Sequence, residues 1–95
     1  MVDLANERYV LRLYVAGLTP RSTLAVERIR AICDRHLAGR HELTIIDLYL
    51  RPDEARKAQI VVAPTLVKQT PGPVRLFIGD MTDEKRILAG LNIAS

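Results

Sequence analysis

The sequence has little cysteine, few aromatic residues and no long apolar run. Its 95 residues include one cysteine, no tryptophan, three tyrosines and one phenylalanine. A single cysteine excludes a framework of internal disulfides. No apolar run approaches the roughly 18 residues that cross a bilayer, so neither a transmembrane helix nor a membrane partner is expected. Residues 1–7 carry acids and lack the basic start of a signal peptide, which favours a cytoplasmic location.

The charge of the chain is modest and dispersed. The formal net charge is +3, and 48% of the residues are hydrophobic, which is enough for a folded core. Arginines are spread over both halves and mostly alternate with acids such as Glu27 and Asp34. There is no dense basic block and little aromatic interleaving, so a nucleic-acid partner is not expected. The length predicts one domain over residues 1–95.

Strand and helix signals alternate along the chain. Thr19 and Pro20 are typical of a helix start, and Gly39 of a helix stop. The turn residues 70–73 predict a hairpin between the strands that flank them, and Thr82 is the expected cap of a last helix. The predicted order is βαβαββα: strand 9–15, helix from 20, strand 43–48, helix 52–58, strands 66–68 and 74–78, and helix 83–91. Helices covering a mixed sheet give an α/β fold.

The local sequence of residues 87–93 is compatible with both a helix and a strand. It is apolar enough for a strand, and Gly90 costs a helix roughly 1 kcal/mol relative to alanine. Weak helix endings are common, so this ambiguity alone is slight evidence for two conformations.

No set of residues assembles into a catalytic or metal site. Cys33 falls on the apolar face of the first helix and is expected in the core. His36 and His41 lack partners at zinc spacing, and Ser22 lacks a local histidine and acid. The order of elements resembles the thioredoxin layout, in which a Cys-x-x-Cys opens the first helix opposite a later cis-proline. Here that stretch runs from Thr19 to Ser22 without cysteine, so we expect binding rather than electron transfer and no cofactor.

Several stretches, in this order and spacing, resemble the KaiB family of circadian-clock proteins. The resemblance covers roughly residues 8–93. It rests on Tyr9 to Gly17 with Thr19, Pro20 and Ser22, on Ile46 to Leu48 with Pro52, on Ala63 to Leu66, on Pro73 to Arg75 with Ile78 to Asp80, and on Gly90 with Leu91.

The resemblance implies a binding protein and not an enzyme. Members of this family bind the N-terminal ring of the KaiC ATPase hexamer in a thioredoxin-like fold, and in cyanobacteria they also sequester KaiA and displace the kinase SasA. The family is metamorphic, and the same chain can form a tetrameric ground state of order βαββααβ. That order is the alternative fold for this chain. Pro64 is expected to follow a cis peptide bond, as in thioredoxin-like folds.

The resemblance also assigns residues. Tyr9 and Gly90 match positions tied to the balance between the two folds, and Asn92 stands where cyanobacterial members have an aspartate, whose loss favours the thioredoxin-like state. The expected KaiC-binding residues lie on the second helix and its preceding loop: Tyr49, Leu50, Arg51, Pro52, Asp53, Lys57 and Gln59. The alternative for Tyr49 and Leu50 is that both side chains simply pack inward.

Departures from the family pattern narrow the expected partners. Glu42 and Thr44 replace the usual residues of the strand that meets KaiA, Leu18 replaces an asparagine, and the acidic C-terminal tail is absent. These changes weigh against KaiA and leave KaiC as the expected partner, with self-association to a dimer or tetramer open. Two alternatives are a sensor module of a SasA-type kinase and a stress-signalling homologue. A thiol oxidoreductase is disfavoured by Thr19 and Ser22.

Overall fold

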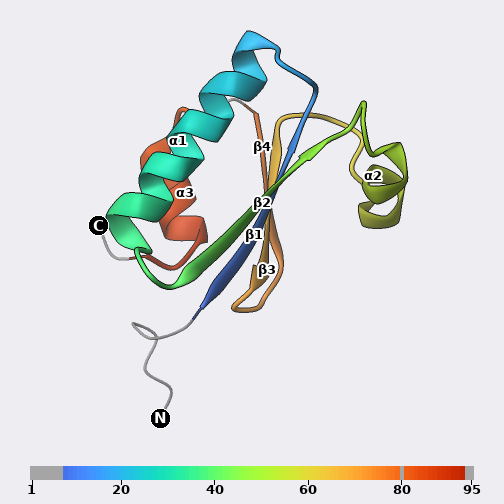
Figure 1. Ribbon diagram of the computed structural model, residues 1–95. Helices are drawn as coiled ribbons and strands as arrows, with labels where there is room; N and C mark the ends of the chain where they lie inside the picture. The colour runs from blue at the N-terminus through green and yellow to red at the C-terminus, as the bar shows by residue number, and fades with distance from the viewer. Residues whose placement is uncertain (1–7, 80, 94–95) are drawn as a thin grey trace.

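The computed structural model describes residues 8–79 and 81–93 and has the predicted order of elements (Figure 1). The alternative order βαββααβ is not the one seen here. The elements are β1 (Tyr9–Val15), α1 (Pro20–His36), β2 (His41–Asp47), α2 (Pro52–Ala58), β3 (Thr65–Thr70), β4 (Arg75–Ile78) and α3 (Glu84–Gly90). The second strand begins two residues earlier than predicted, and the third extends further at both ends.

The four strands form one mixed sheet of order β2-β1-β3-β4. β1 pairs with β2 in parallel, which requires the crossover helix α1. β1 and β3 are antiparallel, and β3 and β4 form the predicted hairpin. The ends of β1 and β2 and the start of β3 therefore share one end of the sheet.

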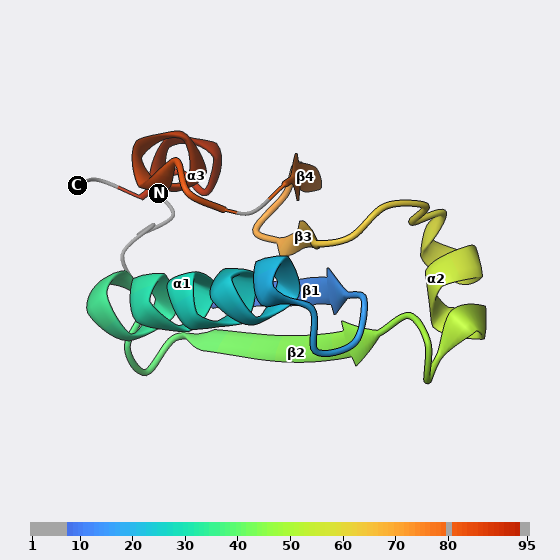
Figure 2. The same cartoon turned by 90° about the horizontal axis from the view of Figure 1, so that it is seen from above.

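The two faces of the sheet are covered unequally (Figure 2). α1 and α3 pack on one face through a large apolar cluster that includes Leu11, Leu13, Ile29, Leu66 and Leu88. On the other face α2 contributes to a smaller cluster of Tyr14, Ile46, Ala55, Ile60 and Val67. The alternation of side chains along β1 explains the division, because successive residues of a strand point to opposite faces.

Two helix caps were predicted from the sequence: the one for α1 is confirmed and the one for α3 is wrong. The hydroxyl of Thr19 accepts a hydrogen bond from the Ser22 backbone N–H at 3.3 Å, as expected of the helix start. Thr82, however, is not the cap of α3. The next residue, Asp83, takes that place, and its carboxylate accepts from the Arg86 backbone N–H at 3.1 Å. A carboxylate at a helix N-terminus is also favoured by the helix dipole.

Two further observations concern the backbone and the helices. The peptide bond between Ala63 and Pro64 is cis. Within residues 8–79 and 81–93, no helix has the length and apolar character needed to cross a membrane.

Candidate functional site

The residues at the thioredoxin-type motif positions have structural roles. Ser22 is buried, and its hydroxyl accepts a hydrogen bond from the Ala16 backbone N–H at 3.0 Å. This bond ties the start of α1 to the loop that follows β1. The sole cysteine, Cys33, lies in the main core, where burial, together with the nearby charge of Asp34, raises the pKa of its thiol to about 11. The thiolate is the reactive form of cysteine, so this environment suppresses its chemistry.

The protein is expected to have no disulfide reductase activity. Thr19 and Ser22 cannot form a thiolate, and the raised pKa of Cys33 leaves little thiolate at neutral pH. Insulin reduction by dithiothreitol should therefore run at the rate measured without the protein. An acceleration that disappears in a Cys33→Ser variant would contradict this expectation.

The two histidines lie at the junction of α1 and β2 and are both half-buried. A ring nitrogen of His41, Nδ1, lies 2.8 Å from the Leu37 carbonyl oxygen. In the parts of the chain that the structure describes, no three histidine, cysteine or acidic side chains gather into a group that could hold a metal ion.

The loop between β2 and α2 is wound around Asp47. The carboxylate of Asp47 accepts from the backbone N–H groups of Gly17 at 3.2 Å and of Tyr49 at 2.9 Å. Its backbone carbonyl accepts from the N–H groups of Leu50 and Arg51 at 3.1 and 2.8 Å. One residue thus joins the loops that follow β1 and β2 and fixes the direction in which the chain enters α2.

The same loop aims its apolar side chains outward. Tyr49 is 74% exposed and Leu50 is 79% exposed, so the alternative that both pack inward is wrong. The Tyr49 ring lies beside Gly17, whose φ is +65°, and a Cβ added there would lie 3.2 Å from the ring. A larger residue at position 17 would be strained and would displace the tyrosine.

The helix α2 presents most of its length to solvent. Only Ala55 and the following Ile60 are buried against the sheet. Asp53 and Glu54 lie in the first turn and Arg56 and Lys57 in the last, an arrangement that complements the helix dipole. The seven residues that the family resemblance assigns to KaiC binding are all exposed on this loop and helix: Tyr49, Leu50, Arg51, Pro52, Asp53, Lys57 and Gln59.

The structure adds three apolar residues to this end of the molecule. Leu18 in the loop after β1 is 96% exposed, and Val61 after α2 is 90% exposed. Val62 is 44% exposed. Sequence reasoning missed them, although the apolar run Ile60 to Val62 next to Pro64 was a usable signal. We define the end surface as Leu18, Tyr49, Leu50, Val61 and Val62 with the exposed side of α2.

The three residues assigned to the fold balance meet at the end of α3. The Tyr9 hydroxyl donates to the Leu91 carbonyl oxygen at 2.7 Å in the buried interior. Gly90, the last residue of α3, lies against Phe77, and a Cβ added there would lie 2.3 Å from the ring. Asn92 has a φ of +61°, and its N–H donates to the Ala89 carbonyl at 3.1 Å. We call these contacts the α3 end cluster.

Comparison with known proteins gives consistent matches over nearly the whole chain. Residues 12–93 match the KaiB domain profile. The circadian clock oscillator protein KaiB of Prochlorococcus marinus (strain MIT 9312) is 40% identical over 89 residues, covering 94% of this chain and 85% of that protein. The homologous protein of Nostoc sp. (strain PCC 7120) is 42% identical over 89 residues, covering 94% and 82%.

Solved structures identify the fold. The N-terminal domain of Synechococcus elongatus SasA aligns with a TM-score of 0.73 at 26% identity, covering 97% of this chain and 90% of that one. A thioredoxin from Fasciola hepatica aligns with a TM-score of 0.73 at 16% identity, covering 93% of this chain and 82% of that one. At this identity the likeness shows only the fold. The fold is therefore thioredoxin-like, as predicted, while the sequence matches set the chain apart from thioredoxins. The chain belongs to the KaiB family.

Proposed function

We propose that the protein is a non-catalytic, cytoplasmic circadian-clock regulator that binds the N-terminal ring of a KaiC ATPase hexamer and modulates its phosphorylation state. The relatives at about 40% identity are circadian clock oscillator proteins. The observation that carries the proposal is the exposure of Tyr49 and Leu50 beside α2. Exposed aromatic and apolar side chains ringed by charges are typical of a protein interface.

The geometry of the end surface suits a transient complex. Its apolar residues sit on three loops at one end of the sheet, and Asp47 links two of those loops. The salt bridge between Arg12 and Glu54, at 3.8 Å, adds a polar contact between α2 and the sheet. A preordered loop loses little conformational entropy on binding, which favours association.

A double substitution at the end surface tests the proposal. Leu50→Asp with Asp53→Arg removes an exposed apolar contact and reverses a charge while leaving the buried Ala55 and Ile60 in place. We expect at least a tenfold loss of affinity for cognate KaiC in a pull-down or by surface plasmon resonance. Circular dichroism and the melting temperature should stay close to those of the wild type.

The matched control carries the same two types of change on α1. Leu24 is 41% exposed and Asp34 is exposed, so Leu24→Asp with Asp34→Arg alters a surface away from α2. This variant should bind KaiC as the wild type does. Full binding by a folded Leu50→Asp/Asp53→Arg variant would remove these residues from the proposed interface.

A sensor module of a SasA-type kinase is the second candidate, because the SasA N-terminal domain shares both the fold and 26% identity. It would use the same end surface on KaiC. The coding sequence downstream of Ser95 distinguishes the two, since a kinase continues into a dimerisation helix with a phosphorylatable histidine. The changed residues Glu42 and Thr44 keep KaiA outside the proposed partners, and a stress-signalling role would involve KaiC without KaiA.

We further propose that the α3 end cluster sets the balance between this fold and the tetrameric family ground state. Tyr9, Gly90 and Asn92 act on the same short stretch, residues 87–93, which would change from helix to strand. Asparagine tolerates a positive φ better than most residues do, so Asn92 suits the helix end that it follows. The thioredoxin-like monomer is then the form that presents the end surface.

A further inference from the structure

The free edge of β4 differs from the rest of the sheet. The strand order ends at β4, which pairs with β3 on one side only among the described residues. The opposite edge, β2, is seven residues long, whereas β4 has four, from Arg75 to Ile78. An unpaired edge is a template on which another strand can form backbone hydrogen bonds.

The side chains of β4 and its preceding turn alternate in character. Val74, Leu76 and Ile78 are 61%, 50% and 58% exposed, on the face opposite to α3. Phe77 points the other way and is buried beneath α3. An added strand would therefore meet an apolar row on one face and the border of α3 on the other.

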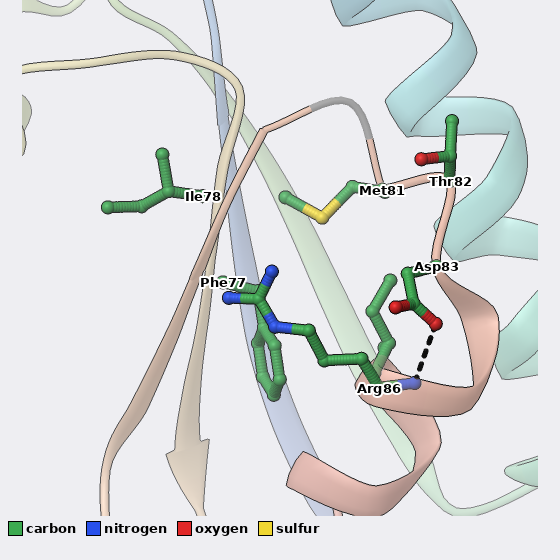
Figure 3. Close-up of a pocket in the computed structure, with 7 residues that line it drawn as sticks. Phe77, Ile78, Met81, Thr82, Asp83 and Arg86 are labelled. Carbon is green, nitrogen blue, oxygen red and sulfur yellow. Dashed lines mark hydrogen bonds between the residues drawn. The ribbon is translucent and has the colours of Figure 1, made fainter.

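The border between β4 and α3 is basic. Arg75 and Arg86 line one hollow of about 300 Å³ together with Leu76, Phe77 and the end of α3. Within residues 8–79 and 81–93, no acidic side chain lines this hollow. Arg86 also reaches a smaller adjoining hollow next to Asp83. In Figure 3 its side chain extends from α3 past Phe77 toward β4, while the Asp83 carboxylate accepts from the Arg86 backbone N–H.

Both arginines remain available for a partner. The ion pairs within residues 8–79 and 81–93 are Arg12 with Glu54 and Arg35 with Glu84, and neither includes Arg75 or Arg86. Two guanidinium groups at the rim of one hollow, with no ionic partner among the described side chains, favour carboxylates over other groups. A second copy of this chain would bring four such groups to the same side of a joint sheet, which disfavours self-pairing.

We infer that the edge of β4 binds an extended acidic segment of another protein, in which acidic and apolar side chains alternate. The acidic side chains would face Arg75 and Arg86, and the apolar ones would cover Leu76 and Ile78. The apolar row of β4 lies on the same face of the sheet as α2, because Phe77 between Leu76 and Ile78 points to the α3 face. It follows the outer edge of the sheet and shares no residue with the end surface proposed for KaiC. The inference does not depend on that proposal.

Three fluorescein-labelled octapeptides test the inference by fluorescence anisotropy with the full chain. One alternates glutamate and valine, one carries four glutamates followed by four valines, and one alternates lysine and valine. The alternating glutamate peptide should bind at least tenfold more tightly than the other two. Its binding should shift the amide resonances of residues 75–78 more than those of β2.

A charge reversal supplies the specific test. In the variant Arg75→Glu with Arg86→Glu, the preference should invert, so that the lysine peptide binds more tightly than the glutamate peptide. The control Arg21→Glu with Arg30→Glu makes the same change of net charge at two exposed positions of α1 and should keep the original preference.

Several results would overturn the inference. Equal binding of the alternating and block peptides would mean general charge attraction. An inverted peptide preference in the Arg21→Glu/Arg30→Glu control would mean the same. Failure of all three peptides to bind would exclude the edge as a docking strand for such a segment. A dimer seen by light scattering and dissociated by Leu76→Lys would show that a second copy occupies β4.

Discussion

Replacing Gly90 by alanine is expected to destabilise this fold by about 1–2 kcal/mol, because the new methyl group collides with a buried ring. A Cβ at position 90 would lie 2.3 Å from Cε1 and 2.4 Å from Cζ of Phe77. Phe77 is 6% exposed and packed in the main core, so its ring cannot move away freely. Alanine's higher helix propensity offsets less than about 1 kcal/mol of this cost. Urea unfolding followed by circular dichroism measures the change.

A double-mutant cycle attributes the loss to that collision. Phe77→Leu removes the ring edge that faces Gly90, so Gly90→Ala should cost much less in the Phe77→Leu background, with a coupling of about 1 kcal/mol. Gly72→Ala is the matched control, because no atom lies within 4 Å of a Cβ there. Its effect should stay within about 0.5 kcal/mol. Additive effects of Gly90→Ala and Phe77→Leu would contradict the steric explanation.

The same substitution bears on the proposed fold balance. If the α3 end cluster holds residues 87–93 in the present form, the Gly90→Ala chain should populate the alternative state more. Backbone chemical shifts would then report strand at 87–93, and light scattering would report a tetramer. Simple unfolding without either signal would leave the stability prediction intact and count against the fold-balance proposal.

The order of elements could be predicted from the sequence because each boundary has its own local signal. Thr19 with Pro20 starts α1, and the turn at 70–73 joins β3 to β4. The cap of α3 was misassigned because two cap-forming residues, Thr82 and Asp83, are adjacent, and local chemistry does not rank them. The longer β2 and β3 depend on pairing with β1, which no local pattern reports.

The candidate site was only partly accessible to sequence reasoning. The sequence alone does not distinguish an apolar residue of the core from one at an interface. Tyr49 and Leu50 are exposed because the loop turns around Asp47, and only the structure shows that turn. Val61 and Val62 continue an apolar run in which only Ile60 is buried. Which residue of this run is buried depends on the direction in which the chain leaves α2.

The contacts around the end of α3 are tertiary and have no local signature. Tyr9 and Leu91 are 82 residues apart in sequence, yet their hydrogen bond joins the start of β1 to the end of the last helix. Resemblance to the family pointed to Tyr9, Gly90 and Asn92 individually. Their contacts converge on residues 89–92, at the end of α3. This convergence is the physical ground for the joint role that we propose for them.

Replacing Tyr9 by phenylalanine is expected to cost about 1–2 kcal/mol of unfolding free energy, because it leaves the buried Leu91 carbonyl without the Tyr9 donor. The hydroxyl donates to that oxygen at 2.7 Å, and Leu91 is 1% exposed. The ring remains, so its packing in the core and its contact with the Arg40 guanidinium, 5.7 Å from the centroid, are retained. For a chain of this size the melting temperature should fall by roughly 4–8 °C per kcal/mol.

The exposed tyrosine provides the matched control for this change. Tyr49 is 74% exposed, so Tyr49→Phe removes the same hydroxyl from a solvated position and should alter stability by less than about 0.5 kcal/mol. Hydrogen exchange gives the local readout, since the amides of Leu91 and Ile93 should lose protection in Tyr9→Phe before those of β1 do. Equal stability of the two variants would mean that the bond to Leu91 does not hold the end of α3, and the fold balance would then have to rest on Gly90 and Asn92 alone.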